Sequence, residues 1–302
     1  MTLTSVLYHN IAERETDFEV GLGLTTHPDT FEKHLRYYQK NYDIIDLDTL
    51  LSGRLPRRAL LLTFDDCYRS VLDATRRFLN PRGVPAVFFV NPSLVGGGIS
   101  LDNWIAWAAR RHGLSTVTAT LGLAADEDAT VASVIAKALG RCSAKERRNI
   151  RRTLEAAFPI SAKELQGRSP MLEVSDIAEL GRLGVEVGNH TASHVHCGAL
   201  NPEEYADELV GAQAALETMS GKAVRSFSVA YGHERDLPAP VLTTLRDSGH
   251  QAIFLVHARS NSVRKSHDVW YRVSFRNEDI SKLPLKLSVL PVIRTLRDQV
   301  FR

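Results

Sequence analysis

Short runs of apolar and β-branched residues recur along the 302-residue chain, and helical patterns separate most of them. The runs expected to form strands are residues 5–8, 60–64, 86–90, 185–187, 227–230, 252–256 and 269–273. Strands that alternate with helices favour parallel βαβ units. We therefore expect an α/β fold, either a barrel or a doubly wound sheet.

The segment of about residues 202–220 carries the clearest helix signals. Asn201 can cap its start, Pro202 fits its first position, and Gly221 can end it. The acidic residues that follow Pro202 suit the positive end of the helix dipole. We expect one helix here.

Residues of about 100–172 break the alternation, because they are expected to form two or three helices with no strand among them. We interpret them as a helical insertion in a single domain that spans residues 1–302. The insertion could be a lid over a site, a docking surface, or only a solvated excursion. Its basic cluster RRNIRR, residues 147–152, is expected to be the hydrated face of a helix.

The last segment, about residues 280–302, is an amphipathic tail that mixes Leu, Val and Ile with Lys and Arg. Such a tail could make a peripheral contact with an anionic membrane surface. Pro284 and Pro291 are expected to interrupt a long helix, so packing of the tail onto the core is favoured over membrane contact.

The composition narrows the choice of function. Lys and Arg number 37 against 35 Asp and Glu, and this balance argues against a nucleic-acid partner. The start of the chain resembles no secretory leader, and no apolar stretch approaches the roughly 20 residues of a membrane span. The three cysteines lack a CxxC spacing, which argues against a disulfide framework. A cytoplasmic location is expected, where the C-terminal tail could make a peripheral contact with the membrane.

The first candidate for chemistry is the segment ALLLTFDDCY, residues 59–68, in which an apolar run ends at two carboxylates. Residues just beyond such a buried strand line the functional face of barrels and open α/β sheets. Because successive strand side chains point to opposite sides, one of Asp65 and Asp66 can face a metal while the other faces the substrate. A helix N-cap would explain one aspartate and leave the second without a role.

The second candidate is VEVGNHTASHVHC, residues 185–197, which also follows a short strand. If the segment forms a helical turn, His190 and His194 lie on one face and can bind one cation. Residue 191 is Thr, so the segment is not the HExxH motif of zinc proteases and a base must come from elsewhere. The aspartate pair is the obvious source. One carboxylate and two imidazoles would leave a divalent ion with open positions for water.

Together, TFDD at 63–66 and HTASH at 190–194 resemble the first two motifs of the polysaccharide deacetylases, carbohydrate esterase family 4, which share the NodB-homology domain. Further similarity lies in YH at 8–9, AVFFV at 86–90, VEVGNH at 185–190, AYG at 230–232 and YRV at 271–273. The resemblance implies an α/β fold that is a distorted (β/α) barrel, usually with seven strands.

The resemblance also implies roles for individual residues. Asp66, His190 and His194 match the metal triad, which holds zinc or another divalent ion. Asp65 matches the catalytic base, which takes a proton from the metal-bound water that attacks an amide carbonyl. The backbone N–H of Tyr231 matches a second oxyanion donor. The implied enzyme is a hydrolase of amide bonds other than peptide bonds, and its substrate is an N-acetylated sugar in a polysaccharide, an oligosaccharide, or a lipid- or nucleotide-linked precursor.

Some positions depart from the family pattern. Ser228 stands where many members have an arginine that orients the base, and Arg272 is the candidate to supply the missing charge. The family takes its general acid from a late L-x-H motif, for which His257 is the candidate in this sequence. His196 and His267 are expected to be surface histidines.

Cys67 occupies a position that the family usually gives to glycine. A thiolate next to a metal site could be a fourth ligand, but the implied triad is already complete. We expect Cys67 to pack as a small hydrophobic residue.

Two alternatives use the same fold. One is a deformylase or another amide or imide hydrolase with the same site, and the other is a degenerate member that binds glycan without cleaving it. An aspartyl phosphatase is disfavoured, because its DxD pattern needs a spacer that Asp65 and Asp66 lack.

Overall fold

Seven parallel strands close into a barrel in the computed structural model, which describes residues 2–165, 169–262 and 268–300. Hydrogen-bonded pairing runs from β1 through β5, β6, β7, β8, β9 and β11 and returns to β1. Their bounds are β1 Thr2–Tyr8, β5 Ala59–Phe64, β6 Ala86–Val90, β7 Val185–Asn189, β8 Ser226–Ser228, β9 Ala252–Val256 and β11 Val269–Ser274. Each predicted strand is therefore one strand of the barrel, and the doubly wound sheet is excluded.

Within the described residues, four very short strands lie outside the barrel circuit and were not predicted. β4 (Asp43–Ile45) pairs in parallel with the start of β5, and β10 (Asn261–Ser262) pairs antiparallel with the start of β1. β2 (Asn10–Ile11) and β3 (Thr25–Thr26) form a separate pair. Strands of two or three residues are too short for a period-of-two pattern to reveal them.

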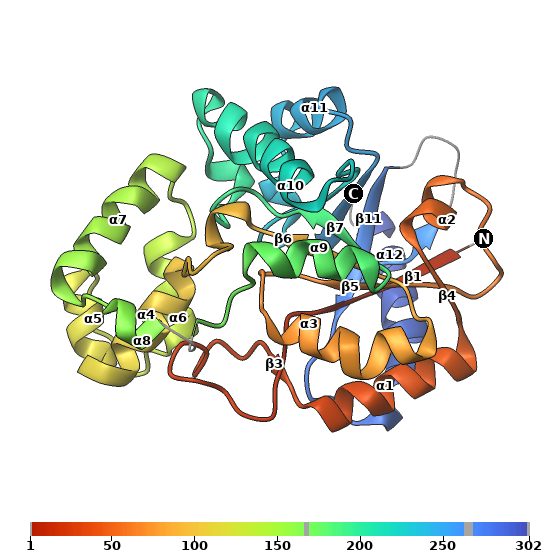
Figure 1. Ribbon diagram of the computed structural model, residues 1–302, viewed down its shortest axis with the longest axis horizontal. Coiled ribbons are helices and arrows are strands. Elements are labelled where there is room, and N and C mark those ends of the chain that lie inside the picture. Colours follow the sequence, from red (N-terminus) through yellow and green to blue (C-terminus); the bar gives the residue numbers. More distant parts are fainter. Residues whose placement is uncertain (1, 166–168, 263–267, 301–302) are drawn as a thin grey trace.

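Helices surround the barrel (Figure 1). The α-helices outside the insertion are α1 Pro28–Asn41, α2 Leu47–Leu51, α3 Ser70–Ala74, α9 Val174–Arg182, α10 Ala212–Ser220, α11 Ala239–Asp247 and α12 Leu290–Val300. The 3-10 turns are Asn80–Arg82, Pro92–Leu94, Cys197–Ala199, Pro202–Glu204, Glu234–Asp236 and Ile280–Lys282, and the π-helical turns are Thr75–Leu79, Ala206–Gly211 and Leu285–Val289. No helix in the described ranges is long and apolar enough to cross a membrane.

The predicted helix over 202–220 is confirmed as a run of 3-10, π and α turns that ends at Ser220. At its start the backbone N–H of Asn201 donates to the carboxylate of Glu204 at 3.0 Å. At its end Gly221 takes a left-handed backbone with φ of 66°, which glycine adopts without steric cost.

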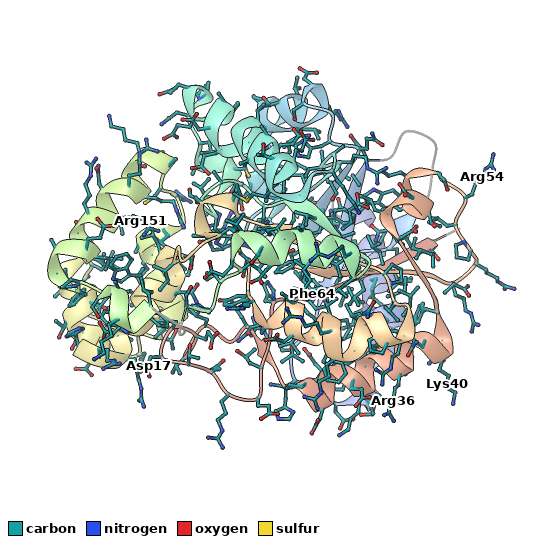
Figure 2. The ribbon with its side chains drawn as sticks, viewed as in Figure 1. Asp17, Arg36, Lys40, Arg54, Phe64 and Arg151 are labelled. Atoms are coloured by element: carbon teal, nitrogen blue, oxygen red, sulfur yellow. The ribbon has the colours of Figure 1, made fainter. Side chains whose placement is uncertain are left out.

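Strand side chains alternate between the inside of the barrel and the surrounding helices. In β5, Leu61 packs with Val87 and Phe89 in one buried cluster, whereas Leu60 and Leu62 join a second cluster with side chains of the helices. Figure 2 shows the contrast between Phe64, which is fully buried, and charged side chains such as Arg36 and Lys40, which project outward from α1. The same alternation carries Thr63 and then Asp65 onto the inner side of β5.

The inner space near the site is tightly packed. A Cβ on Gly188 of β7 would lie 2.4 Å from the ring of Phe89 and 2.8 Å from the hydroxyl oxygen of Ser226. Only glycine therefore fits at this position, directly before the strand end that leads to His190.

The described part of the insertion forms five helices, which share a hydrophobic cluster with Phe18 and lie at one side of the molecule in Figure 1. They are α4 Leu101–His112, α5 Leu114–Thr120, α6 Val131–Leu139, α7 Ala144–Ala157 and α8 Ala162–Leu165. Trp104, Trp107, Leu139 and Phe158 are among the buried members of that cluster. Within the described part of 100–172, these helices carry the secondary structure apart from a single bridge at Met171.

The C-terminal tail is one continuous helical run, so the expected interruption by proline is wrong. The π-helical turn Leu285–Val289 leads directly into α12. Pro291 lies just after that turn, and π turns are a known way for a helix to accommodate the lost N–H of proline. Leu283 and Leu287 are buried in the core cluster that also contains Phe275.

Candidate metal centre and active site

The predicted site residues meet in a cavity of about 450 Å³ at the carboxyl ends of the barrel strands. The barrel side of the cavity includes Asp65, Asp66, His190, His194 and Tyr231. The insertion side includes Ser100, Asp102, Asn103, Ala132, Ile135, Ala136 and Gly140. The insertion therefore forms one wall of the candidate active site.

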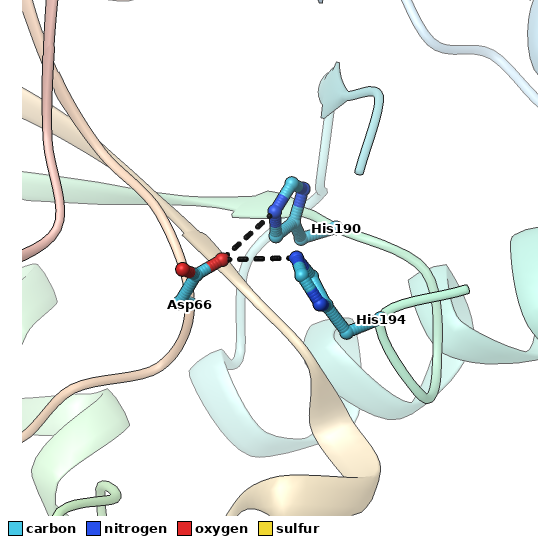
Figure 3. Close-up of side chains that lie close together, drawn as sticks. All are labelled: Asp66, His190 and His194. Atoms are coloured by element: carbon cyan, nitrogen blue, oxygen red, sulfur yellow. Dashed lines mark ion pairs between the residues drawn. The ribbon is translucent and has the colours of Figure 1, made fainter. Parts of the chain in front are cut away.

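Asp66, His190 and His194 form a compact cluster (Figure 3). Oδ1 of Asp66 lies 3.2 Å from Nε2 of His190 and 3.1 Å from Nε2 of His194. Asp66 has a left-handed backbone with φ of 76°, which turns its side chain away from the direction of Asp65. The structure thus brings together the three residues that the resemblance assigns to a metal.

A bent loop, and not a helical turn, brings the two histidines together. Thr191 and His194 both have left-handed backbone conformations, with φ of 65° and 58°. The side-chain amide of Asn91 donates to the carbonyl oxygens of His190 and Thr191 and holds this loop. The helical-turn geometry considered from the sequence is therefore wrong, although the two rings still converge.

The second ring nitrogen of each histidine also has a partner. Nδ1 of His190 lies 2.7 Å from the carbonyl oxygen of Ser228, which can only accept, so this nitrogen carries the hydrogen. Nδ1 of His194 lies 3.4 Å from Oδ2 of Asp102. Both contacts favour the tautomer in which Nε2 offers its lone pair to a cation beside Asp66.

This donor set fits a divalent ion. Ligand atoms in a tetrahedral zinc site lie roughly 3.3 Å from one another, given metal–ligand distances of about 2.0–2.2 Å. The two Asp66–histidine distances, 3.2 and 3.1 Å, are close to that spacing. Burial alone would lower the pKa of His194, but the carboxylates of Asp66 and Asp102 outweigh burial and raise it to about 10. The surroundings of His194 therefore favour positive charge.

Asp65 is held by the buried guanidinium of Arg272. Nη1 of Arg272 donates to Oδ1 of Asp65 at 2.8 Å, and Nη2 donates to Oδ2 at 2.7 Å. Nη2 of Arg272 also donates to Oγ of Ser228 at 2.6 Å, and that hydroxyl lies 3.1 Å from Oδ2 of Asp65. Burial acts to raise the pKa of Asp65, but Arg272 and His190 outweigh it and leave the pKa below its ordinary value.

Arg272 reaches this position from β11, which only β9 separates from β8, the strand that carries Ser228. Its side chain is fully buried, and its guanidinium carbon lies 5.2 Å from the ring centre of Phe89 and 5.8 Å from that of Phe254. The charge expected from the sequence is therefore present next to Asp65, and the hydroxyl of Ser228 accepts a hydrogen bond from Arg272.

Tyr231 also has a left-handed backbone, with φ of 61°. Its ring stacks on His196, with ring centres 3.7 Å apart and planes at 8°. His196 is only 5% exposed and lies 3.2 Å from Asp236, so the expectation of a surface histidine is wrong. Both stacked side chains line the cavity.

The structure does not bring His257 into the cavity. β9 ends at Val256, and His257 begins the next loop, with its ring 6.3 Å from that of Tyr271. His9 occupies the cavity instead, with Nε2 3.9 Å from Oδ2 of Asp66. Its Nδ1 is buried without a hydrogen-bond partner among the described residues. His267 lies outside the described residues.

Cys67 is fully buried in the same core cluster as Leu72 and Phe88. Burial raises the pKa of its thiol to about 12, so the thiol stays protonated near neutral pH. Cys67 also has a left-handed backbone, with φ of 64°. That conformation explains why glycine suits the same position in the family pattern.

Sequence reasoning missed two insertion residues that reach the site, Asp102 and Arg147. Nη2 of Arg147 lies 3.8 Å from Oδ2 of Asp102, and Arg147 is 3% exposed, unlike the hydrated face expected for RRNIRR. A signal for its burial exists, because Arg147, Ile150 and Leu154 share one face of a helix by their spacing. Asp102 carries no such signal, since acidic residues are common in the first turn of any helix.

Fold and site together define a (β/α) barrel with a candidate metal centre at the carboxyl ends of its strands. The family model described as polysaccharide deacetylase matches residues 148–254, about a third of the chain. That range contains HTASH and AYG but neither the Asp65–Asp66 pair nor Arg272. No curated protein matches the sequence significantly.

Solved structures extend the similarity to nearly the whole chain. The deacetylase PplD of Streptococcus pyogenes, in complex with acetate, has 12% identity and a TM-score of 0.64 over 95% of this chain and 99% of its own. IcaB from Ammonifex degensii has 18% identity and a TM-score of 0.60 over 96% and 97%. A de-N-acetylase from Aggregatibacter actinomycetemcomitans has 14% identity and a TM-score of 0.60 over 95% and 100%. The resemblance to polysaccharide deacetylases and the expected barrel are confirmed, and at these identities the structural likeness establishes the fold.

Proposed function

We propose that this protein is a metal-dependent N-deacetylase that hydrolyses the amide of an N-acetylated sugar. The observation that carries the proposal is the meeting, in one cavity, of the Asp66–His190–His194 cluster with the Asp65–Arg272 pair. The match to the polysaccharide deacetylase family and the fold shared with enzymes of that type support it.

Asp66, His190 and His194 would hold the ion, for which zinc is our first choice. A divalent ion bound there supplies a Lewis acid that makes water a stronger nucleophile and polarises a carbonyl group. Asp65 is ionised near neutral pH, because Arg272 keeps its pKa low. Asp65 then accepts the proton that the attacking water loses.

The remaining roles fall to residues around the same cavity. The backbone N–H of Tyr231 would donate to the carbonyl oxygen as negative charge develops on it. The proton for the leaving amine would come from His9, which lines the cavity, in place of His257, which does not.

The test is acetate release from a panel of N-acetylated sugars and glycan precursors, with metal content measured on the same samples. Asp65→Asn should keep its metal and lose at least 100-fold in turnover, within the range typical of a lost general base. His190→Ala should lose both metal and activity. The control is Asp73→Asn, which removes a carboxylate that is 67% exposed on α3, and it should change neither.

The same assay separates the alternatives. Formate release without acetate release would identify a deformylase with this site. Bound metal without turnover on any amide or ester would favour a glycan-binding protein and would contradict the proposal. Full activity in Asp65→Asn would remove Asp65 as the base.

We also propose that the C-terminal helix contacts an anionic lipid surface. Its solvent-facing side carries a stripe of large apolar residues that are 45–55% exposed, namely Leu285, Val289, Val292 and Ile293. Their spacing places them on one face of the helix, and Lys282, Lys286 and Arg294 lie beside them in the sequence. The cytoplasmic location expected from the sequence stays a prediction.

A further inference from the structure

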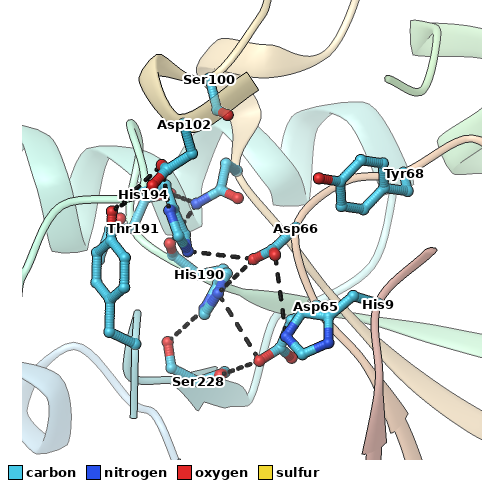
Figure 4. Close-up of polar contacts among 12 residues, drawn as sticks. His9, Asp65, Asp66, Tyr68, Ser100, Asp102, His190, Thr191, His194 and Ser228 are labelled. Carbon is cyan, nitrogen blue, oxygen red and sulfur yellow. Dashed lines mark hydrogen bonds and ion pairs between the residues drawn. The ribbon is translucent and has the colours of Figure 1, made fainter. Parts of the chain in front are cut away.

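The insertion contacts the candidate metal centre through Asp102. Asp102 lies in the first turn of α4, just after the capping residue Ser100, and is 9% exposed. Its Oδ2 lies 3.4 Å from Nδ1 of His194, while Nε2 of the same ring lies 3.1 Å from Oδ1 of Asp66. Figure 4 shows His194 between these two carboxylates, one from the barrel and one from the insertion.

The two histidines of the cluster are held in different ways. His190 contacts the backbone carbonyl of Ser228, which strand β8 fixes within the barrel. His194 contacts a side-chain carboxylate that belongs to a separate group of helices. A carboxylate that accepts from a ligand histidine fixes its tautomer and ring orientation and raises its basicity. The orientation of His194 therefore depends on how the insertion docks.

Asp102 is itself held from two sides. The hydroxyl group of Tyr231 lies 3.2 Å from each of its carboxylate oxygens and donates to the carboxylate. From α7, Nη2 of Arg147 lies 3.8 Å from Oδ2 of Asp102, and Nη1 of Arg147 lies 3.5 Å from the Tyr231 hydroxyl. Because the ring of Tyr231 is stacked on His196, its hydroxyl has a fixed direction. Asp102 thus joins the loop after β8 to two insertion helices.

We propose that Asp102 is a positioning residue for His194, and that the insertion is through it a structural part of the metal centre. The inference rests on the metal site proposed above. Since the same contact links α4 to His194, metal binding and docking of α4 must stabilise each other by the same free energy. The insertion is in this view neither a simple lid nor a solvated excursion.

The first test measures Zn²⁺ affinity by competition with a chromophoric chelator. Asp102→Asn should weaken Zn²⁺ binding by roughly 10–100-fold, as is typical when the partner of a ligand histidine is removed. His194→Ala combined with Asp102→Asn should bind no more weakly than His194→Ala alone, because the two residues act through one contact. With Co²⁺ as probe, the visible absorption spectrum of Asp102→Asn should differ from that of the wild type.

The matched control is Asp176→Asn. Asp176 is also a buried aspartate in the first turn of a helix, 4% exposed and 3.4 Å from Arg69, but it lies on α9 and is not among the residues that line the cavity. Loss of the Asp176 charge should lower the free energy of unfolding without changing Zn²⁺ affinity or the Co²⁺ spectrum. If Asp102→Asn fails to fold, Tyr231→Phe keeps the stacked ring, removes only the hydroxyl that holds Asp102, and should weaken Zn²⁺ binding by a smaller factor.

A second measurement tests the coupling itself. Zn²⁺ should slow hydrogen exchange at the amides of α4 in the wild type and should have little effect there in Asp102→Asn. Zn²⁺ affinity within threefold of the wild type, together with an unchanged Co²⁺ spectrum, would overturn the role of Asp102. Failure of the wild type to bind Zn²⁺ would instead overturn the proposed metal site, so the two failures can be told apart.

Discussion

Replacement of Arg272 by methionine tests the ion pair between Arg272 and the proposed catalytic base Asp65 more directly than any other single change. Methionine fills much of the same volume but removes a guanidinium that makes two hydrogen bonds to Asp65 and one each to Ser228 and Thr63. The carboxylate of Asp65, which is 2% exposed, would then remain buried without its cation. Breaking a buried ion pair on one side costs about 3–5 kcal/mol.

The pH dependence of the activity of Arg272→Met should also show that Asp65 has lost its cation. In the wild type, Arg272 is the largest influence that lowers the pKa of Asp65, and burial acts in the opposite direction. Without Arg272 the pKa of Asp65 must rise, and the base is then ionised only at higher pH. The acidic limb of the kcat/KM profile should move to higher pH, while the metal content should remain that of the wild type.

Urea denaturation at pH 7 measures how much the free energy of unfolding falls in Arg272→Met. A double variant isolates the part of that loss that belongs to the ion pair. Asp65→Asn in the Arg272→Met background removes the unpaired charge and should recover part of the lost stability, which gives a coupling energy for the pair. Arg272→Lys keeps a charge but not the two-point contact, so it should lie between the wild type and Arg272→Met. An unmoved acidic limb together with a stability loss below about 1 kcal/mol would refute the reasoning.

The remaining predictions concern a buried histidine, the tail and the cysteine. Burial lowers the pKa of His250 from 6.5 to about 4, so the unfolded chain binds a proton before the folded one and stability must fall as pH drops through that window. The free energy of unfolding should fall by about 3 kcal/mol. Thermal unfolding of His250→Gln should therefore depend less on pH between pH 7 and 4 than that of the wild type. The same pH dependence in both proteins would contradict this prediction. Val292→Asp should reduce co-sedimentation with vesicles containing phosphatidylglycerol, whereas Val174→Asp, at a valine that is 53% exposed on α9, should not; equal effects would reject the lipid contact. Cys67→Gly should change stability by no more than about 1–2 kcal/mol, because relief of the left-handed strain offsets the lost packing, and any loss of bound metal would reveal the thiol as a ligand.

The pattern of the sequence was sufficient for the strands of the barrel, whereas the choice of a barrel over a doubly wound sheet came from the family resemblance. Each strand of the circuit is a run of apolar residues whose length and continuity are local properties, and a strand buried on both faces shows them directly. The Asp65–Asp66 pair and the two histidines were also visible, because each follows such a strand. Their convergence follows from parallel pairing, which places the carboxyl ends of the strands at one edge.

Other parts of the site depend on contacts between segments far apart in the chain. Arg272 is 207 positions from Asp65, and nothing around it in the sequence distinguishes an arginine buried in the barrel from one on its surface. His257 directly follows the last residue of β9, and a strand boundary read from sequence is too coarse to decide whether such a side chain enters the cavity. The helical turn considered for HTASH was wrong because positive-φ positions at Thr191 and His194 cannot be read from residue types that rarely adopt them.

By itself, then, the sequence determined the strands of the barrel, the two clusters of chemically active side chains and the packing role of Cys67, because these follow from local hydrophobic patterning and residue type. Only the tertiary structure decided that Arg272 pairs with Asp65, that His9 lies in the cavity, and that Asp102 of the insertion contacts His194. Those relations are set by the closure of the barrel and by the docking of separate helices. Both depend on shape and burial between distant segments, which no local pattern records.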